Sequence, residues 1–448
     1  MTSKPASVEP LSGGLNFKLS TMMFLQYAIW GAWLPLLWPY LSGHREFTPA
    51  QIGDMFAVGA IGAIVAPFIA GQIADRWFNT EKFLGISHIL GGILVWQLAS
   101  IETYKGFLAF SLIYSLIYSP TLALTNSLSF HHLPDRDRDF GRIRVWGTVG
   151  WIVVGIGIGQ WLLHQHTPAT GDAATVAAAQ AAGMADAFKL SGVLGVLMGI
   201  FCFLLPSTPP AKEEKKSAIG SALGAIKHQP LLTLFLIAVP VSCIHQFYFV
   251  HTAPFLGEFQ NQAEGFINTV NKIVGVGGGG LMTIGQMMEI AVLAFIPLFA
   301  KRCSRKTLLC VGLAAYTLRM VLFAYGPSLS PELQLPAIIL GVSMHGFCFG
   351  CFIFVAFMVV DEECSADVRA SAQSLFNLVI VGIGIIVGSK IAGSVAEWAK
   401  STNGDMDYTK LFSVPMWAAL ACLVLMLLFY PNRKPTLAEG DTDEPDKS

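Results

Sequence analysis

The chain has 448 residues, of which 54% are hydrophobic and only 13% are charged, and its formal net charge is -1 at pH 7. An ordinary soluble domain carries roughly 25% charged residues, so this composition excludes a protein whose main solvent is water. The near-zero charge gives no basis for a nucleic-acid partner.

Twelve stretches of the chain are apolar enough, and long enough, to approach the roughly 20 residues that a helix needs to cross a bilayer. They lie near residues 17–41, 50–74, 82–101, 105–130, 144–163, 187–206, 229–256, 279–300, 306–325, 334–360, 370–396 and 411–430. Many contain Gly, Pro or polar residues, which lipid tolerates only when they find partners inside a helix bundle. The sequence therefore predicts an all-α membrane protein with 12 packed transmembrane helices.

The orientation follows from the charged residues between these stretches. The start, Met1 to Leu19, is polar and lacks a short apolar core with a cleavage site, which argues against a removable signal peptide. With the N-terminus inside, 20 of the 28 Lys and Arg residues fall on the inner side and seven on the outer side. Because Lys and Arg accumulate on the cytoplasmic side, we expect both termini in the cytoplasm of a multi-pass inner (plasma) membrane protein.

The longest inner connection divides the chain into two halves. It is polar, carries the run Lys212 to Lys216 and lies midway between six helices and six. We expect an N-terminal six-helix half (1–206), a cytoplasmic linker (207–228), a C-terminal six-helix half (229–430) and a disordered cytoplasmic tail (431–448). Two such halves with a substrate between them near the midplane form a transporter architecture.

An inner-loop signature occurs in both halves, as Gly71 to Trp77 in the first and Lys301 to Lys306 in the second. The first copy resembles the G-x-x-x-D-R-x-G-R/K-K motif of the major facilitator superfamily, with Phe78 in place of the second Gly. The charges of Asp75 and Arg76 can pair across the inner surface and lock one state of a gate. The alternative is a solvated loop whose positive charge only follows the topology.

Three charged residues within predicted helices stand out, because a charge at the centre of a membrane helix costs roughly 2.5 to 3.5 kcal/mol and indicates function. They are Glu289, Arg144 and Arg319. Gln286 and Glu289 are three residues apart and share one helix face. Burial favours a neutral carboxyl and a nearby guanidinium favours an ionised one, so Glu289 is the candidate proton carrier. The alternative is a permanent structural salt bridge.

Arg144, Thr148 and Trp151 follow an i, i+4, i+7 spacing and form one stripe on a helix. We assign Arg144 to pairing with Glu289 or with the ligand, and the alternative is a plain interfacial arginine. No single partner of Arg319 can be named from the sequence, so Arg319 is assigned to a structural network.

Three further helices combine a polar side chain with an aromatic one on the same face. They are Gln26 with Trp30, Gln246 with Phe249, and His345 with Phe349. Aromatic rings beside amides suit stacking and edge hydrogen bonding of a ring-shaped ligand. Each pair alone is explained by packing, but together they predict a binding site shared by both halves.

No feature of the sequence indicates an enzyme, a cofactor or a metal site. No nucleophile with a base and no metal-ligand cluster stands out. The glycines from Gly155 to Gly159 lie inside an apolar helix, which indicates close packing rather than dinucleotide binding. Cys348 and Cys351 form a lone CxxC within a helix and are predicted to be small packing residues.

Longer segments resemble the nucleoside:proton symporters of the major facilitator superfamily, whose bacterial members carry nucleosides across the inner membrane. The segments are Phe24 to Leu34, Ser119 to Asn126, Arg142 to Gly150, Leu318 to Gly326 and Val368 to Gln373. The resemblance covers nearly the whole chain. It implies the major facilitator fold and alternating access to one central site.

The resemblance also implies roles for individual residues. Ligand and proton coupling are attributed to positions that match Arg144, Thr148, Gln246, Gln286, Glu289 and Phe349. This chain departs from the family pattern at three positions, with Phe249 for an Asn, Gly350 for an Asp and His345 for a Tyr. A pocket that loses hydrogen-bond partners discriminates polar groups less well, so we expect an altered nucleoside preference. Asp75, Arg76, Arg319 and Arg369 are assigned to gating or structure.

The sequence therefore predicts a monomeric symporter in the lipid bilayer that imports a nucleoside with a proton by rocking of the two halves. Two alternatives stay open, a facilitator of another polar solute such as a sugar or nucleobase, and a membrane sensor that binds its ligand without moving it. The exact substrate and the proton stoichiometry are not fixed by the sequence.

Overall fold

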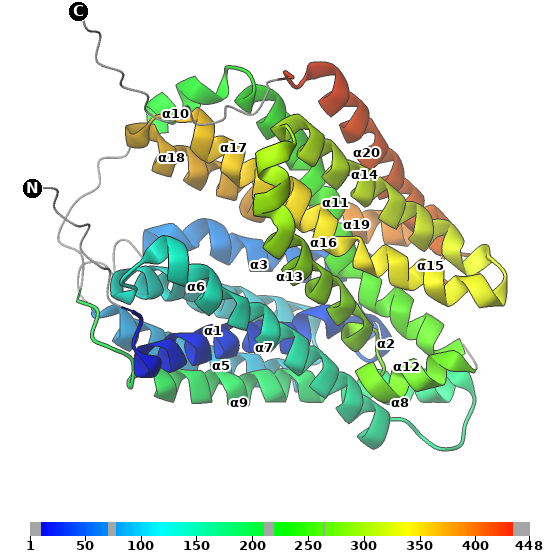
Figure 1. Ribbon diagram of the computed structural model, residues 1–448. Coiled ribbons are helices and arrows are strands. Elements are labelled where there is room, and N and C mark those ends of the chain that lie inside the picture. Colours follow the sequence, from blue (N-terminus) through cyan, green and yellow to red (C-terminus); the bar gives the residue numbers. More distant parts are fainter. Residues whose placement is uncertain (1–9, 70–77, 210–218, 263–264, 433–448) are drawn as a thin grey trace, which may run out of the picture.

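The computed structural model describes residues 10–69, 78–209, 219–262 and 265–432. Within these ranges the chain folds into helices, connecting turns and one isolated β-bridge between Lys400 and Met406. Figure 1 shows the helices as two bundles, with the first part of the chain in one and the second part in the other.

The first bundle contains the helices up to residue 202. They are α1 (Gly13–Trp33), η1 (Leu34–Leu36), α2 (Leu37–Gly43), α3 (Pro49–Ile69), α5 (Thr80–Leu98), α6 (Tyr104–His132), α7 (Arg136–Gln165), α8 (Ala173–Gly183) and α9 (Ala185–Cys202). The break at η1 coincides with Pro35, which has no N–H to continue the hydrogen bonds of α1.

The second bundle contains the helices from residue 219 onward. They are α10 (Ile219–Ile226), α11 (Leu231–Gln262), α12 (Phe266–Val274), α13 (Gly279–Arg302), α14 (Arg305–Tyr325), η3 (Gly326–Ser328), α15 (Pro331–Ser343), α16 (His345–Phe347), η4 (Cys348–Phe354), α17 (Val355–Glu363), α18 (Ala366–Asn377), η5 (Leu378–Ile383), α19 (Gly384–Ala399) and α20 (Tyr408–Phe429). The short helix α10 lies within the predicted linker.

Ten helical stretches in the described ranges are long and apolar enough to cross a membrane. The two other predicted spans are α1 and α5, with 21 and 19 residues. Their apolar sequence is diluted by polar side chains, among them Gln26 and His88, which hydrogen-bond to each other inside the bundle. These two helices bring the number to the 12 of the predicted fold.

Three features of the helices differ from the predicted spans. The span predicted at 187–206 is preceded by α8, so that α8 and α9 together begin at Ala173. The nine-residue helix α12 lies in a loop and is too short to span a bilayer, but it buries Ile267 and Val274 against the bundle. The spans predicted at 334–360 and 370–396 each contain a π-helical segment, η4 and η5.

A side chain of α11 hydrogen-bonds to the π-helical segment η5. Ser242 Oγ donates to the Ile380 carbonyl oxygen at 2.5 Å. Such segments widen the helix by one residue per turn and are frequent at functional sites. Both occur in the second bundle.

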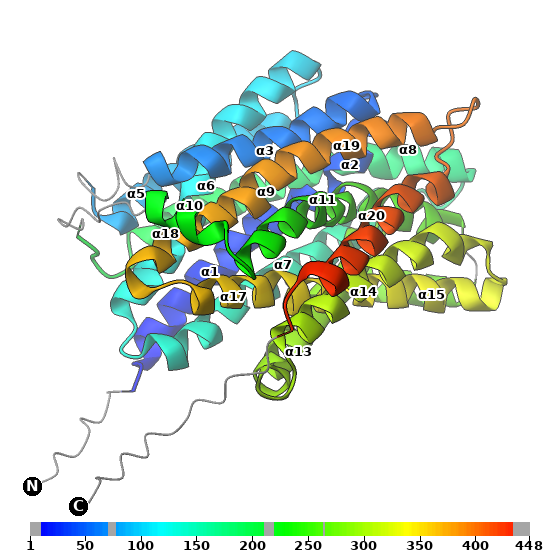
Figure 2. The ribbon, with the colours of Figure 1, turned by 90° about the horizontal axis from the view of Figure 1, so that it is seen from above.

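The two bundles touch closely along α3 and α19, which run side by side in Figure 2. A Cβ atom added to Gly53 of α3 would lie 2.8 Å from the Ser389 carbonyl oxygen and 3.3 Å from Gly393 Cα. The absence of side chains at Gly53 and Gly393 therefore lets the two backbones meet.

Polar contacts between the bundles occur at one end of the molecule. We call the end where the described chain starts at Pro10 and stops at Asn432 the terminal end, and the opposite end the distal end (Figure 1). At the distal end Lys390 forms an ion pair with Asp54, and Tyr104 donates to the same carboxylate at 2.6 Å.

Two further hydrogen bonds join the bundles at the distal end. The Val276 amide donates to the Gly159 carbonyl at 3.1 Å, and Gln160 Nε2 donates to the Lys272 carbonyl at 2.9 Å. A Cβ on Gly159 would lie 2.7 Å from the Val274 carbonyl oxygen, so the approach requires glycine there.

Candidate functional site

Aromatic side chains from both bundles meet at the interface. The Trp151 ring of α7 packs edge-on against Phe249 of α11, with ring centroids 6.4 Å apart, and against Trp30 of α1 at 5.7 Å. Trp151 also lies over Gly31, where an added Cβ would come within 2.8 Å of the indole. The predicted aromatic faces of both halves are thus adjacent, and α1 fixes the position of Trp151.

A carboxyl and an amide lie close together on α13. The Glu289 side chain is 16% exposed, and its Oε2 atom is 3.7 Å from Nε2 of the buried His345 ring. Gln286, one turn earlier, is 5% exposed, and its Oε1 atom has no hydrogen-bond partner in the described ranges. Buried polar atoms are normally paired, so this amide oxygen is available to a ligand.

Arg144 lies on α7, which packs against α13 across the interface. Its guanidinium carbon is 4.1 Å from the centre of the Tyr27 ring, which is a cation–π contact. Among the residues that the structure describes Arg144 forms no ion pair. Thr148, one turn further on, is half-buried. Arg144 is therefore held by a ring, with its charge still available to a carboxylate or a ligand.

Gln246 of α11 is buried and donates from Nε2 to Ser389 Oγ of α19 at 3.0 Å. Phe349 lies half-buried in η4. Gly350, which stands where the family has an Asp, faces α13, since an added Cβ would lie 2.7 Å from Val292 Cγ1. A larger residue at position 350 would thus displace Val292.

Gln26 lies inside the first bundle and is fully buried. Its Nε2 donates to Thr121 Oγ1 at 2.9 Å, and its Oε1 accepts from His88 Nε2 at 2.9 Å. Both ends of the amide are occupied, so Gln26 joins α1, α5 and α6 in this structure. Its predicted contact with substrate stays a prediction.

Arg319 of α14 is completely buried and has neighbours that the sequence did not reveal. Its Nη1 donates to His345 Nδ1 at 3.2 Å, and its guanidinium lies over the rings of Tyr248 (4.4 Å) and Tyr316 (5.0 Å). Its Nε and Nη2 atoms have no partner in the described part of the chain. Arg319 thus joins the predicted site through His345.

Tyr316 and a further residue of this cluster, His245, each left a signal in the sequence. Tyr316 precedes Arg319 by three residues and therefore shares its helix face. His245 directly precedes Gln246, and its Nδ1 lies 2.6 Å from the Tyr316 hydroxyl. Asp54 was a further missed signal, because it is a carboxylate inside a predicted span.

Of the other residues assigned to gating or structure, the structure describes only Arg369. Asp75 and Arg76 fall outside the described residues. Arg369 of α18 is exposed, and its Nε lies 3.5 Å from Asp361 Oδ1 in the same bundle. Their gating roles stay predictions.

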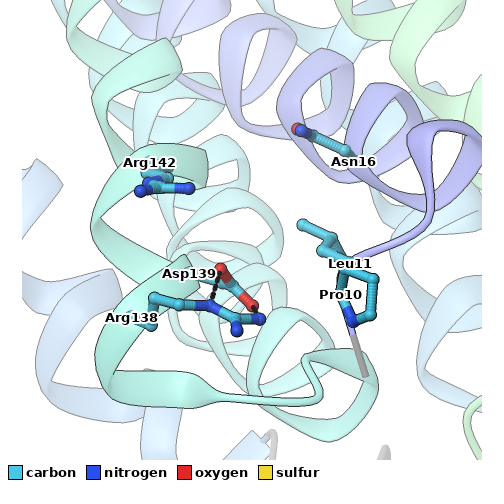
Figure 3. A pocket seen from close by; sticks show the side chains of 6 residues that line it. All are labelled: Pro10, Leu11, Asn16, Arg138, Asp139 and Arg142. Carbon is cyan, nitrogen blue, oxygen red and sulfur yellow. Dashed lines mark hydrogen bonds and ion pairs between the residues drawn. The ribbon is translucent and has the colours of Figure 1, made fainter. Parts of the chain in front are cut away.

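A cavity of about 280 Å³ lies at the terminal end, between the starts of α1 and α7. Figure 3 shows Arg138 directed at Asp139, to which it donates from Nε at 2.8 Å and from Nη2 at 2.6 Å. Arg142 and Asn16 also line the cavity. None of the predicted substrate-binding residues contributes to it.

Comparisons with known proteins bear directly on this arrangement. A family model described as "Nucleoside H+ symporter" matches residues 14–434. The chain belongs to the nucleoside H+ symporter family. The resemblance seen in the sequence is therefore confirmed, and the family consists of membrane transporters rather than enzymes.

Relatives of the chain occur in Escherichia coli (strain K12). The putative nucleoside transporter YegT is 34% identical over 96% of this chain and 97% of YegT. The xanthosine permease is 30% identical over 93% of this chain and 95% of the permease. The nucleoside permease NupG is 27% identical over 89% of this chain and 92% of NupG.

Solved structures show the same fold. The crystal structure of nucleoside transporter NupG matches with a TM-score of 0.77 and 25% identity, over 92% of this chain and 98% of that chain. The D-xylose-proton symporter matches with a TM-score of 0.66 at 15% identity, over 93% of this chain and 98% of that chain. These matches confirm the predicted major facilitator fold.

Proposed function

We propose that this protein imports nucleosides together with protons across a bacterial inner membrane, with Glu289 as the proton carrier. The observation that carries the proposal is the pairing of a nearly buried carboxyl with the unpaired amide oxygen of Gln286 on one face of α13. A carboxyl in such a place exchanges a proton according to its neighbours. Membership of the nucleoside H+ symporter family supports the substrate and the coupling ion.

The side chains around Glu289 have complementary tasks in this proposal. Trp30, Trp151 and Phe249 present ring faces and edges to the flat base of a nucleoside. The side-chain amides of Gln246 and Gln286 bind the polar edges of the base. Thr148 and Arg144 bind the hydroxyl groups of the sugar. Phe249 gives no hydrogen bond where the family has an amide, so the protein discriminates less sharply among polar substituents.

Transport proceeds by rocking of the half from 1 to 206 against the half from 229 to 430, joined by the linker 207–228. The interactions between Asp54 and Lys390 and between Gly159 and Val276 support a state closed at the distal end. The excess of Lys and Arg in the predicted inner connections supports a cytoplasmic terminal end, which makes this state inward-facing. One chain supplies both faces of the site, and this supports a functional monomer in the bilayer.

The proposal is tested by uptake of radiolabelled uridine and adenosine into proteoliposomes, with and without an inward proton gradient. We expect accumulation that depends on the gradient in the wild type and is lost in Glu289→Gln. Accumulation without any dependence on the gradient would remove the proton from the proposal. Absence of uptake of both nucleosides would remove the substrate, and competition with sugars and nucleobases would then identify another solute.

A further inference from the structure

The contact between Arg319 and His345 decides which nitrogen of the imidazole carries the proton. A guanidinium has only donors, so His345 Nδ1 must offer its lone pair to Arg319 Nη1 at 3.2 Å. The proton of the neutral ring is then on Nε2. This is the nitrogen that faces Glu289 Oε2 at 3.7 Å.

The plane of the His345 ring is fixed by its neighbours. Tyr248 stacks against it with centroids 4.5 Å apart and an interplanar angle of 15°. His245 stacks against it at 5.4 Å and 23°, and Phe249 meets it edge-on at 6.0 Å. The Nε2–H group therefore has a set direction, and a movement of the Glu289 side chain by roughly 1 Å or less, within the range of an ordinary rotation, closes the gap to about 3 Å.

We propose that Arg319 and His345 form a positioning pair that presents a neutral N–H donor to the ionised form of Glu289. His345 acts on the carboxylate directly and Arg319 acts through His345. The donor holds the carboxylate in place after its proton has left, which is the step that resets the carrier for a new cycle. The inference rests on the proposed role of Glu289 and adds two residues to it.

The surroundings of His345 exclude it as a proton carrier. A second proton would have to sit on Nδ1, where it would face the donors of Arg319 at hydrogen-bond distance. The titratable or charged groups in and around this cluster come from several elements. They are His245 and Tyr248 of α11, Tyr316 and Arg319 of α14, Cys348 of η4, Glu289 of α13 and Arg144 of α7.

Two substitutions of His345 separate the donor from the ring. In His345→Gln the amide oxygen accepts from Arg319 and the amide nitrogen donates to Glu289, but nothing titrates. In His345→Phe the stacking ring remains and both hydrogen bonds are lost. His345→Met, without a ring or a strong hydrogen-bonding group, serves as a second variant in case the Phe ring does not fit.

The variants are compared in proteoliposomes by two assays, accumulation of labelled uridine driven by a proton gradient, and exchange of labelled for unlabelled uridine without a gradient. Exchange needs no release of the proton, because the loaded carrier moves in both directions. We expect His345→Phe and His345→Met to lower accumulation about tenfold or more, the scale of a lost hydrogen bond to a charged group. Exchange is expected to fall much less than accumulation in these two variants, and His345→Gln is expected to retain most of both activities.

Each other outcome overturns the inference. Undiminished accumulation in His345→Phe would show that the donor is not needed, and loss of accumulation in His345→Gln would indicate a titrating histidine. Equal loss of exchange and accumulation in both the Phe and Met variants would indicate a structural or substrate-binding role. If the wild type itself neither accumulates nor exchanges nucleoside, the proposed function fails first and the inference falls with it.

Arg319→Met tests the second member of the pair. If Arg319 acts only through His345, the double variant Arg319→Met/His345→Phe accumulates as much uridine as whichever of the two single variants accumulates less. Additive losses would give Arg319 a separate role and overturn its place in the pair.

Discussion

Each half of the molecule buries a polar cluster, and the two clusters are built differently. In the first half, Gln26 is bonded at both ends of its side-chain amide to Thr121 and His88, and its backbone carbonyl oxygen accepts from the Tyr118 hydroxyl at 2.5 Å. No charged side chain takes part in these bonds. A buried network that is fully satisfied makes a structure rigid.

The cluster of the second half contains charges and unpaired atoms. The guanidinium of Arg319 has two nitrogens without a partner in the described ranges, and the amide oxygen of Gln286 likewise has none there. Glu289 stands 3.7 Å from His345, a distance longer than a hydrogen bond. This contrast indicates that the neutral cluster of the first half is rigid, whereas the charged cluster of the second half holds groups that can change partners.

Glu289→Gln should have the strongest effect, because it removes the exchangeable proton and keeps the shape of the side chain. We expect concentrative nucleoside uptake to be abolished and exchange to continue. Uptake at equal internal and external pH, measured beside uptake with a gradient, is the control. Accumulation equal to that of the wild type would mean that the charged cluster is structural like the neutral one.

Gln246→Ala is expected to weaken substrate binding about tenfold, because a buried hydrogen bond contributes roughly 0.5 to 1.5 kcal/mol. The apparent affinity for uridine in exchange measures this loss. Ser389→Ala is the matched control, since it removes the partner of Gln246 in this structure but no predicted ligand contact. An unchanged affinity in Gln246→Ala would take this residue out of the site.

His88→Leu tests the neutral cluster. It leaves Gln26 Oε1 buried without its donor, which destabilises the fold by about 1 to 3 kcal/mol. We expect a lower thermal unfolding midpoint in detergent with an unchanged ratio of accumulation to exchange. A changed ratio would show that the first half takes part in coupling and would contradict the contrast between the two clusters.

Lys390→Met at the distal end should have the weakest effect. The Lys390 side chain is 58% exposed, and ion pairs of this kind contribute less than about 1 kcal/mol. Amide hydrogen exchange should become slightly faster at the distal ends of α3 and α19. In the double variant Asp54→Lys/Lys390→Asp, which exchanges the two charges, the exchange rate should return toward the wild-type rate. An exchange rate that stays raised would show that this ion pair does not hold the two halves together.

Much of the fold follows from the sequence, because apolar stretches of spanning length leave few alternatives to helices in a bilayer. The interruptions were harder to predict. Pro35 signals its break, but the π-helical segments Cys348–Phe354 and Leu378–Ile383 have no local sequence period of their own. The helix Phe266–Val274 was not predicted, because it lies in a loop and is too short to span the membrane.

The site was predictable where its residues share one helix and less so where helices meet. The spacing of Gln286 and Glu289 placed both on one face without any tertiary information. The partner of Arg319 lies 26 residues away on another helix, and Lys390 pairs with a carboxylate 336 residues away. Such contacts depend on how helices pack within and between the two bundles, which a single sequence does not encode in any local pattern.

The crossing of α3 and α19 has a consequence for how the resting state can be chosen. Because Gly53 and Gly393 let the two backbones touch, the closed distal end depends on the lack of a single carbon atom at each position. A methyl group at either glycine would act as a wedge that penalises only the orientation in which the helices meet. A single alanine at either position would therefore shift the conformational equilibrium toward the state that is open at the distal end. It would do so without altering any group that binds the solute or the proton.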